Sequence, residues 1–130
     1  MHLSKLPFLL HVIIESAAAS SFIFKPENQL PGPSVAARLV LQSLGGLLLS
    51  TNLICLVFIW RPGFDETSRL VAASLSFWHV WPCYRAYVRL ARPAVDGNGS
   101  KQARTLGGPA VHLGVHVMLF LLFIGVALVG

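Results

Sequence analysis

Charged side chains are scarce in this sequence. Only 12% of its 130 residues are Asp, Glu, Lys or Arg, and just five are acidic, whereas an ordinary soluble domain carries about 25% charged residues. So few charges do not cover the surface of a single globular domain in water. In contrast, 55% of the residues are hydrophobic and the mean hydropathy is +0.68. The composition therefore predicts an integral membrane protein.

Other signals are missing as well. The chain has no internal repeat and no HExxH motif of the kind that marks many zinc sites. Its net charge of +5 is compatible with nucleic-acid binding, but the basic residues lie at the ends of apolar runs, where membrane proteins carry them. We therefore expect membrane lipids as partners and no nucleic acid.

Four apolar runs are long enough to form membrane helices. We predict transmembrane helices at about 6–24, 37–60, 67–91 and 108–129. The third is the weakest, because only 15 residues separate Arg69 from Arg85. It spans a bilayer only if both arginines extend their guanidinium groups toward the headgroups. Under this interpretation Arg85 and Arg89 mark the cytoplasmic end of the helix.

Short connections rich in turn residues separate these runs. "KPENQLPGPS" and "RPGFDETSR" contain proline and glycine, and Asp65 or Thr67 is a plausible N-cap. Because short loops make neighbouring helices antiparallel, we predict one domain over 1–130, an all-α up-down bundle of four transmembrane helices. A homo-oligomer of such bundles is compatible with the pattern.

The first run has a second interpretation. A basic Lys5, an apolar stretch and the small residues at 17–20 also fit a cleaved signal peptide, although Glu15 inside the apolar region disfavours it. With the helix retained, seven basic residues fall on one side of the membrane and three on the other; the seven are Lys25, Arg38, Arg85, Arg89, Arg92, Lys101 and Arg104. This asymmetry predicts that both termini are non-cytoplasmic. For a eukaryotic source, we expect the endoplasmic reticulum or another endomembrane.

Several polar residues lie within the predicted spans. Glu15 is near the middle of the first run, with His11 one turn away on the same face, and His79 is near the middle of the third. His112 and His116 are spaced i, i+4 in the fourth. Glu15, His79 and His116 lie at similar distances from the ends of their predicted helices. We therefore expect them at the same depth in the membrane, where they can meet.

Three interpretations of this constellation remain open. The groups can satisfy one another across helix interfaces and only specify packing. They can perform acid–base chemistry, because a carboxylate and two imidazoles in a dry cavity exchange protons readily. They can also hold a metal ion, since three histidines and a glutamate form an acceptable ligand set.

A family resemblance supports the fold. The order of "KPENQLP", "ARLVLQSLGGLLL" and "DETSRLVAASLSFWHVW" resembles the small four-helix membrane proteins of the DoxX-like type over most of the chain. The resemblance implies a four-helix membrane fold and assigns no catalytic residue. Sterol-isomerase-type membrane proteins are similar in one feature, an acidic residue at depth, which is Glu15 here.

These observations lead to a functional hypothesis. We expect an intramembrane pocket for a small hydrophobic molecule and a cofactor-independent isomerase or cyclase of lipid or terpenoid-type metabolism. Its predicted catalytic residues are Glu15, His79 and His116, and its predicted ligand-binding residues are His11, Asn52, Trp78, Trp81 and His112. A kink at Pro82 is expected to open the pocket. The alternative is a non-catalytic membrane subunit whose buried polar residues only specify helix packing.

Overall fold

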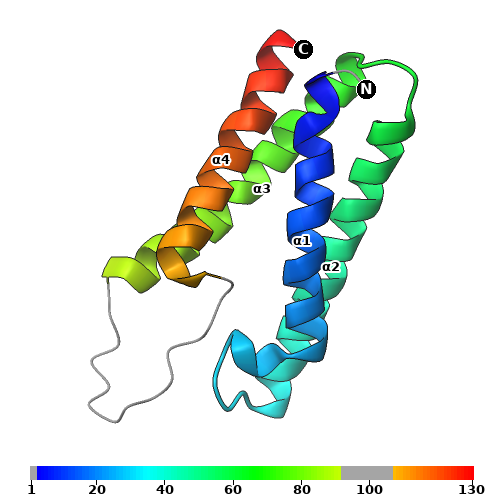
Figure 1. The fold of residues 1–130 in the computed structure, drawn as a ribbon. Coiled ribbons are helices and arrows are strands. Elements are labelled where there is room, and N and C mark those ends of the chain that lie inside the picture. Colours follow the sequence, from blue (N-terminus) through cyan, green and yellow to red (C-terminus); the bar gives the residue numbers. More distant parts are fainter. Residues whose placement is uncertain (1–2, 92–106) are drawn as a thin grey trace.

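The computed structural model describes residues 3–91 and 107–130, which form an all-α protein (Figure 1). Its helices are α1 (Leu6–Phe24), α2 (Val35–Trp60), α3 (Glu66–Ala91) and α4 (Gly108–Val129), with short 3-10 turns at Leu3–Lys5 and Pro26–Asn28. The all-α prediction is confirmed. Compared with the predicted segments, α2 begins two residues earlier and α3 one residue earlier. Arg92, Lys101 and Arg104, three of the basic residues counted above, lie outside the described residues.

Polar side chains and a proline set the helix ends. Ser34 caps α2, because its hydroxyl accepts a hydrogen bond from a backbone N–H of the first turn at 3.2 Å. Asp65 caps α3, since one carboxylate oxygen accepts from both the N–H and the hydroxyl of Ser68, at 2.9 and 2.8 Å. Such caps satisfy donors that have no partner inside the helix. Lys25, which precedes Pro26, leaves the helical conformation and ends α1.

The helices pack mainly as two antiparallel pairs, α1 with α2 and α3 with α4 (Figure 1). One buried cluster joins the pairs and consists of Phe8, Cys55, Ala72, Leu75 and Phe123. Lys5 adds a polar link, because its ammonium group donates to the carbonyl of Ile59 at 3.1 Å and also to that of Arg61. A cation at this position complements the negative end of the α2 dipole.

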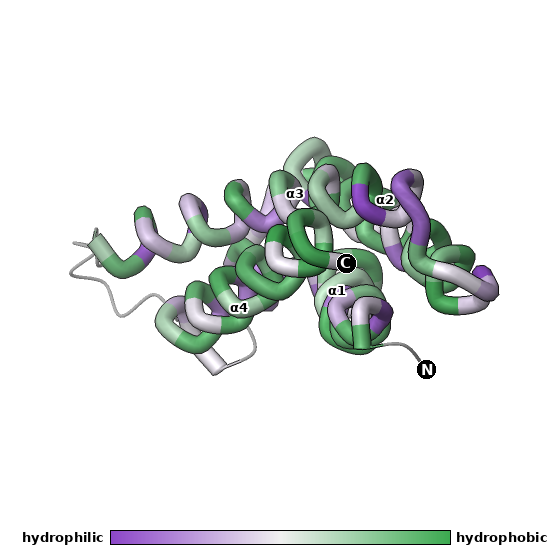
Figure 2. The backbone as a smooth tube through the Cα atoms, turned by 90° about the horizontal axis from the view of Figure 1, so that it is seen from above, coloured by the Kyte–Doolittle hydropathy of each residue, from purple (hydrophilic) through white to green (hydrophobic). Residues whose placement is uncertain are grey.

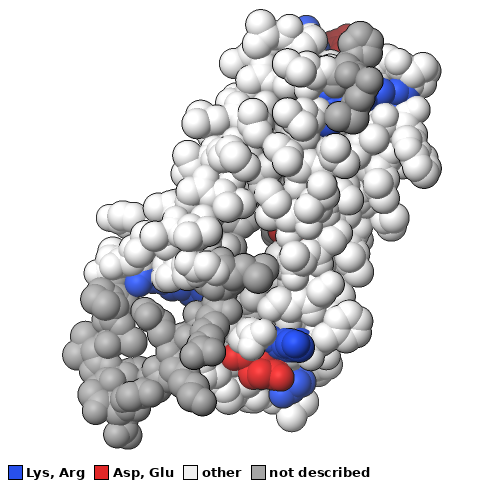
Figure 3. Space-filling view, in the orientation of Figure 1, with Lys and Arg blue, Asp and Glu red and all other residues white. Residues whose placement is uncertain are grey.

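The surface of the molecule is apolar along its length. Ile13, Val57, Phe77 and Leu121, one from each helix, are all at least 58% exposed, and Figure 2 shows hydrophobic residues along all four helices. Exposed apolar surface of this extent is rare on soluble monomers. Charged side chains instead gather toward the two ends of the face shown in Figure 3. This distribution is typical of a protein surrounded by lipid.

Within the described part of the chain, three helical segments are long and apolar enough to cross a membrane: Leu3–Phe24, Val35–Trp60 and Gly108–Val129. They indicate an integral membrane protein. α3 is not among them, because its residues are on average less apolar than those of the other three helices. Pro82 lies inside α3, and the helix continues beyond it to Ala91.

Candidate functional site

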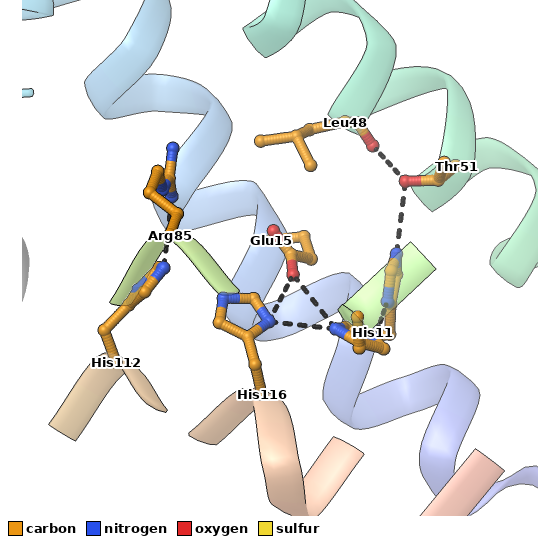
Figure 4. Close-up of polar contacts among 8 residues, drawn as sticks. His11, Glu15, Leu48, Thr51, Arg85, His112 and His116 are labelled. Carbon is orange, nitrogen blue, oxygen red and sulfur yellow. Dashed lines mark hydrogen bonds and ion pairs between the residues drawn. The ribbon is translucent and has the colours of Figure 1, made fainter. Parts of the chain in front are cut away.

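Polar side chains from all four helices meet inside the bundle. α1 supplies His11 and Glu15, α2 supplies Thr51, α3 supplies His79 and α4 supplies His116. Figure 4 labels His11, Glu15, Thr51 and His116. His11 and His79 are 0% exposed, Glu15 2% and His116 4%. The prediction that Glu15, His79 and His116 meet is confirmed by the short distances among them. We call these five residues the polar cluster.

Three imidazoles form a continuous chain through the polar cluster. His79 is the middle one: its Nε2 lies 3.2 Å from Nδ1 of His11, and its Nδ1 lies 2.9 Å from Nδ1 of His116. At the far end, Nε2 of His11 lies 3.1 Å from the Thr51 hydroxyl oxygen. That hydroxyl donates to the carbonyl of Leu48 at 2.8 Å. One series of hydrogen bonds therefore links all four helices.

The Thr51 hydroxyl fixes the direction of this series. It has one hydrogen, which it donates to Leu48, so it accepts a hydrogen bond from Nε2–H of His11. Nδ1 of a neutral His11 then accepts from Nε2–H of His79, and Nδ1 of His79 accepts from Nδ1–H of His116. A single set of tautomers satisfies every contact, and His116 donates at the end nearest the carboxyl group.

Glu15 lies beside the imidazole chain without a hydrogen bond to it. Its Oε1 is 3.6 Å from Nδ1 of His116 and 3.9 Å from Nδ1 of His79, which is too far for a hydrogen bond. This oxygen is buried and has no hydrogen-bond partner among the described residues. An ionisable group at this depth costs on the order of 2.5 kcal/mol or more on insertion. Packing alone therefore gives little reason for a glutamate here.

A partly open pocket of about 280 Å³ lies next to Glu15. Phe22, Leu44 and Leu48 contribute apolar wall, while Glu15 and His116 contribute polar groups. In Figure 3 the middle of the molecule is mostly uncharged, and acidic atoms are visible there beside a small opening. The pocket thus combines apolar walls with one edge of the polar cluster.

The structure divides the predicted ligand-binding residues into two groups. Trp78, Trp81 and His112 line the pocket. His11 belongs to the imidazole chain instead, and Asn52 donates a hydrogen bond to the hydroxyl of Ser16 at 3.0 Å. Neither His11 nor Asn52 is among the described residues that line the pocket.

Arg85 is the one charged residue of the described pocket lining that was not predicted from the sequence. We expected its guanidinium group at the membrane boundary, but it turns inward: Nη2 lies 3.1 Å from Nε2 of His112, and the group covers the ring of Phe22, 5.4 Å from its centroid. Arg85 also lines the pocket. The spacing of Trp78, Trp81 and Arg85 was a usable signal, since residues three and four apart share one face of a helix.

Fold and site together define a class: a small all-α protein with three candidate membrane spans and a buried His/Glu cluster. Comparison of the chain with known protein families, curated proteins and solved structures gives no match. The resemblance to DoxX-like proteins therefore stays a prediction.

Proposed function

We propose that this protein is an integral membrane enzyme that binds a small hydrophobic molecule between its helix pairs and moves a proton on it with Glu15. The observation that carries the proposal is a pocket with apolar walls that ends at a buried carboxyl group, whose Oε1 lacks a hydrogen-bond partner among the described residues. Buried carboxyl groups beside imidazoles are typical of acid–base sites.

The proposed architecture has four membrane-spanning helices, with α3 as the fourth. α3 has 26 residues, or about 39 Å at 1.5 Å per residue, and it packs along α4. Two of its arginines have protein partners: Arg69 donates to the carbonyl of Ala127 at 2.9 Å, and Arg89 to that of Gln29 at 3.1 Å. Its outer face is apolar, with Phe77 64% exposed. A helix of this kind can span a membrane within a bundle despite its arginines.

The proposed reaction is an isomerisation or a cyclisation. Glu15 accepts a proton from one atom of the bound molecule and gives it back to another atom of the same molecule, while His116 and His79, in contact at 2.9 Å, stay neutral beside the carboxyl group. The net change in protons is zero and no electrons are transferred, so the reaction needs no cofactor. Glu15 acts as the donor when the reaction runs in reverse.

Pocket size limits the substrate. A volume of 280 Å³ equals that of about nine liquid water molecules, so the pocket accommodates a ligand of roughly ten non-hydrogen atoms. A molecule with so few polar atoms dissolves in the bilayer and can enter between the helix pairs. We place both termini on the non-cytoplasmic side, because the basic residues are unequally distributed between the two sides. For a eukaryotic source, we place the enzyme in the endoplasmic reticulum or another endomembrane.

A pair of alanines provides the test of the pocket. Ala18 lines it, whereas Ala17 is exposed on the outside of α1. We expect a discrete small molecule in organic extracts of the purified wild-type protein and of Ala17→Phe, detected by mass spectrometry, and its loss in Ala18→Phe. Equal retention by all three proteins contradicts the proposal.

Proton transfer can then be tested on the molecule that is retained. In D₂O, the wild-type protein should exchange one of its carbon-bound hydrogens for deuterium, and Glu15→Gln should not. Exchange at the same rate in Glu15→Gln removes Glu15 from the reaction.

One observation favours a second candidate function, metal binding. Nδ1 of His79, Nδ1 of His116 and Oε1 of Glu15 form a triangle with edges of 2.9, 3.6 and 3.9 Å. Zn²⁺ with tetrahedral bonds of about 2.0–2.1 Å separates its ligand atoms by about 3.4 Å. Ligand atoms of His11, Glu15 and His79 also lie within 4.8 Å of one another.

Elemental analysis separates the two candidates. A metal site predicts close to one ion per chain in protein purified without chelator, lost in His116→Ala and kept in His112→Ala. A metal-free preparation that still catalyses deuterium exchange contradicts the metal site and favours acid–base chemistry.

The alternative from a different class is a non-catalytic membrane subunit. The imidazole chain supports it, because each of its internal contacts has a donor and an acceptor. Glu15 argues against it, because its Oε1 makes no such contact within the described chain.

A further inference from the structure

Arg85 differs from the other described arginines because it lines the pocket that contains Glu15. Arg61 pairs with Asp65, and Arg38 lies 3.7 Å from Glu27. Arg85 forms no ion pair with any described residue, and its one hydrogen-bond contact is with His112 at 3.1 Å. Its Nε is buried and has no hydrogen-bond partner among the residues that the structure describes.

None of the described neighbours of Arg85 forms a salt bridge with it. Phe22 offers the face of its ring 5.4 Å from the guanidinium carbon, which is a favourable but weak contact for a cation. Arg89, one turn further along α3, has the same charge and donates to the carbonyl of Gln29. Glu15 lines the same pocket without a salt bridge to Arg85. A guanidinium group without a bonded counter-ion is costly away from water.

A second donor nearby is also unused. The indole Nε1 of Trp78 is buried without a partner in the described chain, and Trp78 lines the pocket together with Arg85. Guanidinium and indole N–H groups donate hydrogen bonds and accept none. Of the three pocket-lining side chains with a buried atom that has no described partner, two therefore offer donors, one of them on a cation, and the third is the carboxyl group of Glu15.

We propose that the ligand of this pocket is a small apolar molecule with one oxyanion group, a carboxylate or an enolate-type oxygen, held by Arg85 at the His112 end. The inference rests on the proposed function and adds the substrate class to it. The apolar part lies against Trp81 and Leu48, and the oxyanion receives charge-assisted hydrogen bonds from the guanidinium group. The volume of about 280 Å³ fits a molecule with roughly ten non-hydrogen atoms. It is too small to enclose the two tails of a diacyl lipid.

Tryptophan fluorescence can measure this binding. Trp78 and Trp81 line the pocket, and Trp60 is 82% exposed at the end of α2, so the test is made in a Trp60→Phe background in non-ionic detergent. The probe is 8-bromooctanoate, whose bromine quenches nearby indoles. Octanoate and the neutral, equally sized octanamide then compete with it.

The proposal predicts that octanoate displaces the probe at a concentration at least about tenfold lower than octanamide does, as expected for a charge-assisted contact. Arg85→Gln should abolish this preference, and Arg85→Lys should keep part of it. Arg89→Gln is the matched control and should leave the preference unchanged.

The outcomes separate this inference from the proposed function. Equal displacement by octanoate and octanamide in the wild-type protein, or a preference that survives Arg85→Gln, overturns the role of Arg85 and leaves the pocket intact. If neither 8-bromooctanoate nor uncharged 1-bromooctane quenches the pocket tryptophans, the pocket itself and both proposals fail. The wild-type comparison decides the matter even where Arg85→Gln does not fold.

Discussion

At the scale of single residues, the interior of this bundle contains two kinds of polar group. His79 has a partner at each ring nitrogen, His11 at 3.2 Å and His116 at 2.9 Å, so it is fully used in holding the helices together. Glu15 has a buried oxygen with no partner in the described chain. Polar groups that satisfy one another stabilise a fold, whereas unsatisfied ones are kept for activity at a cost in stability.

Thr51 should matter for stability through its hydroxyl. Thr51→Val removes the acceptor of the His11 Nε2–H, which lies 3.1 Å away, and leaves that donor unpaired. We expect a loss of about 0.6–2 kcal/mol in the free energy of unfolding, the range for interhelical hydrogen bonds in membranes. The check is thermal unfolding in detergent, with Thr51→Ser as a control that keeps the hydroxyl. Equal stability of the valine and serine variants contradicts the proposed direction of the imidazole chain.

Counting depth along the predicted helices was enough to bring Glu15, His79 and His116 together. It did not reveal the contacts of Thr51 and Arg85, because these depend on how each helix is rotated about its axis. Apolar residues occur on every face of these helices, so hydropathy does not tell which side points inward. The inward turn of Arg85 needed the positions of Phe22 and His112, which lie on other helices.

At the scale of helices, close contact between α1 and α2 depends on Gly45. A methyl group added there would lie 2.6 Å from Cγ1 of Ile23 and 3.1 Å from the carbonyl oxygen of Ala19. The adjacent Gly46 has open space around the same position. Small residues allow this kind of approach between membrane helices.

We expect Gly45→Ala to destabilise the protein by about 1–3 kcal/mol, since overpacking outweighs the gain in helix propensity. Gly46→Ala is the control and should be neutral or stabilising by up to about 1 kcal/mol. Both are measured by thermal unfolding in detergent. A stable Gly45→Ala with unstable Gly46→Ala would mean that α1 packs on the other side of α2.

The Asp65 cap makes the start of α3 sensitive to acid. Hydrogen bonds from the backbone and the side chain of Ser68, assisted by Arg61, hold the pKa of Asp65 below its usual value. The capping stabilisation is therefore complete above the unfolded-state pKa of about 3.9 and is lost as the pH falls through the lower folded-state pKa. Asp65→Asn keeps an acceptor without the titration.

We expect the melting temperature of the wild-type protein to approach that of Asp65→Asn as the pH is lowered from about 5 toward 3. Unfolding of both proteins across this range provides the measurement. A difference between them that does not change with pH contradicts the capping role.

At the scale of the whole molecule, the number of membrane crossings decides where the chain ends lie. The beginning of α1 and the end of α4 lie at the same end of the structure (Figure 1). This arrangement agrees with four crossings, because an even number of crossings places both termini on one side of the membrane. Three crossings would place them on opposite sides. The length and the apolar outer face of α3 favour four.

Protease protection of terminal tags in sealed membrane vesicles tests this count. We expect tags at the N- and C-termini to be protected together on the non-cytoplasmic side. Tags on opposite sides would show that α3 does not cross, and two cytoplasmic tags would reverse the orientation while keeping four crossings.

The central claim is that Glu15 is present for proton transfer and not for packing, and the melting temperature of purified Glu15→Gln tests it most directly. Glutamine keeps the size of the side chain but cannot ionise. Because Oε1 of Glu15 has no hydrogen bond to lose within the described chain, we predict a melting temperature equal to or above that of the wild-type protein. A fall of roughly 4 °C or more, corresponding to ~1 kcal/mol for a chain of this size, would show that Glu15 stabilises the fold and would contradict a role in proton transfer alone.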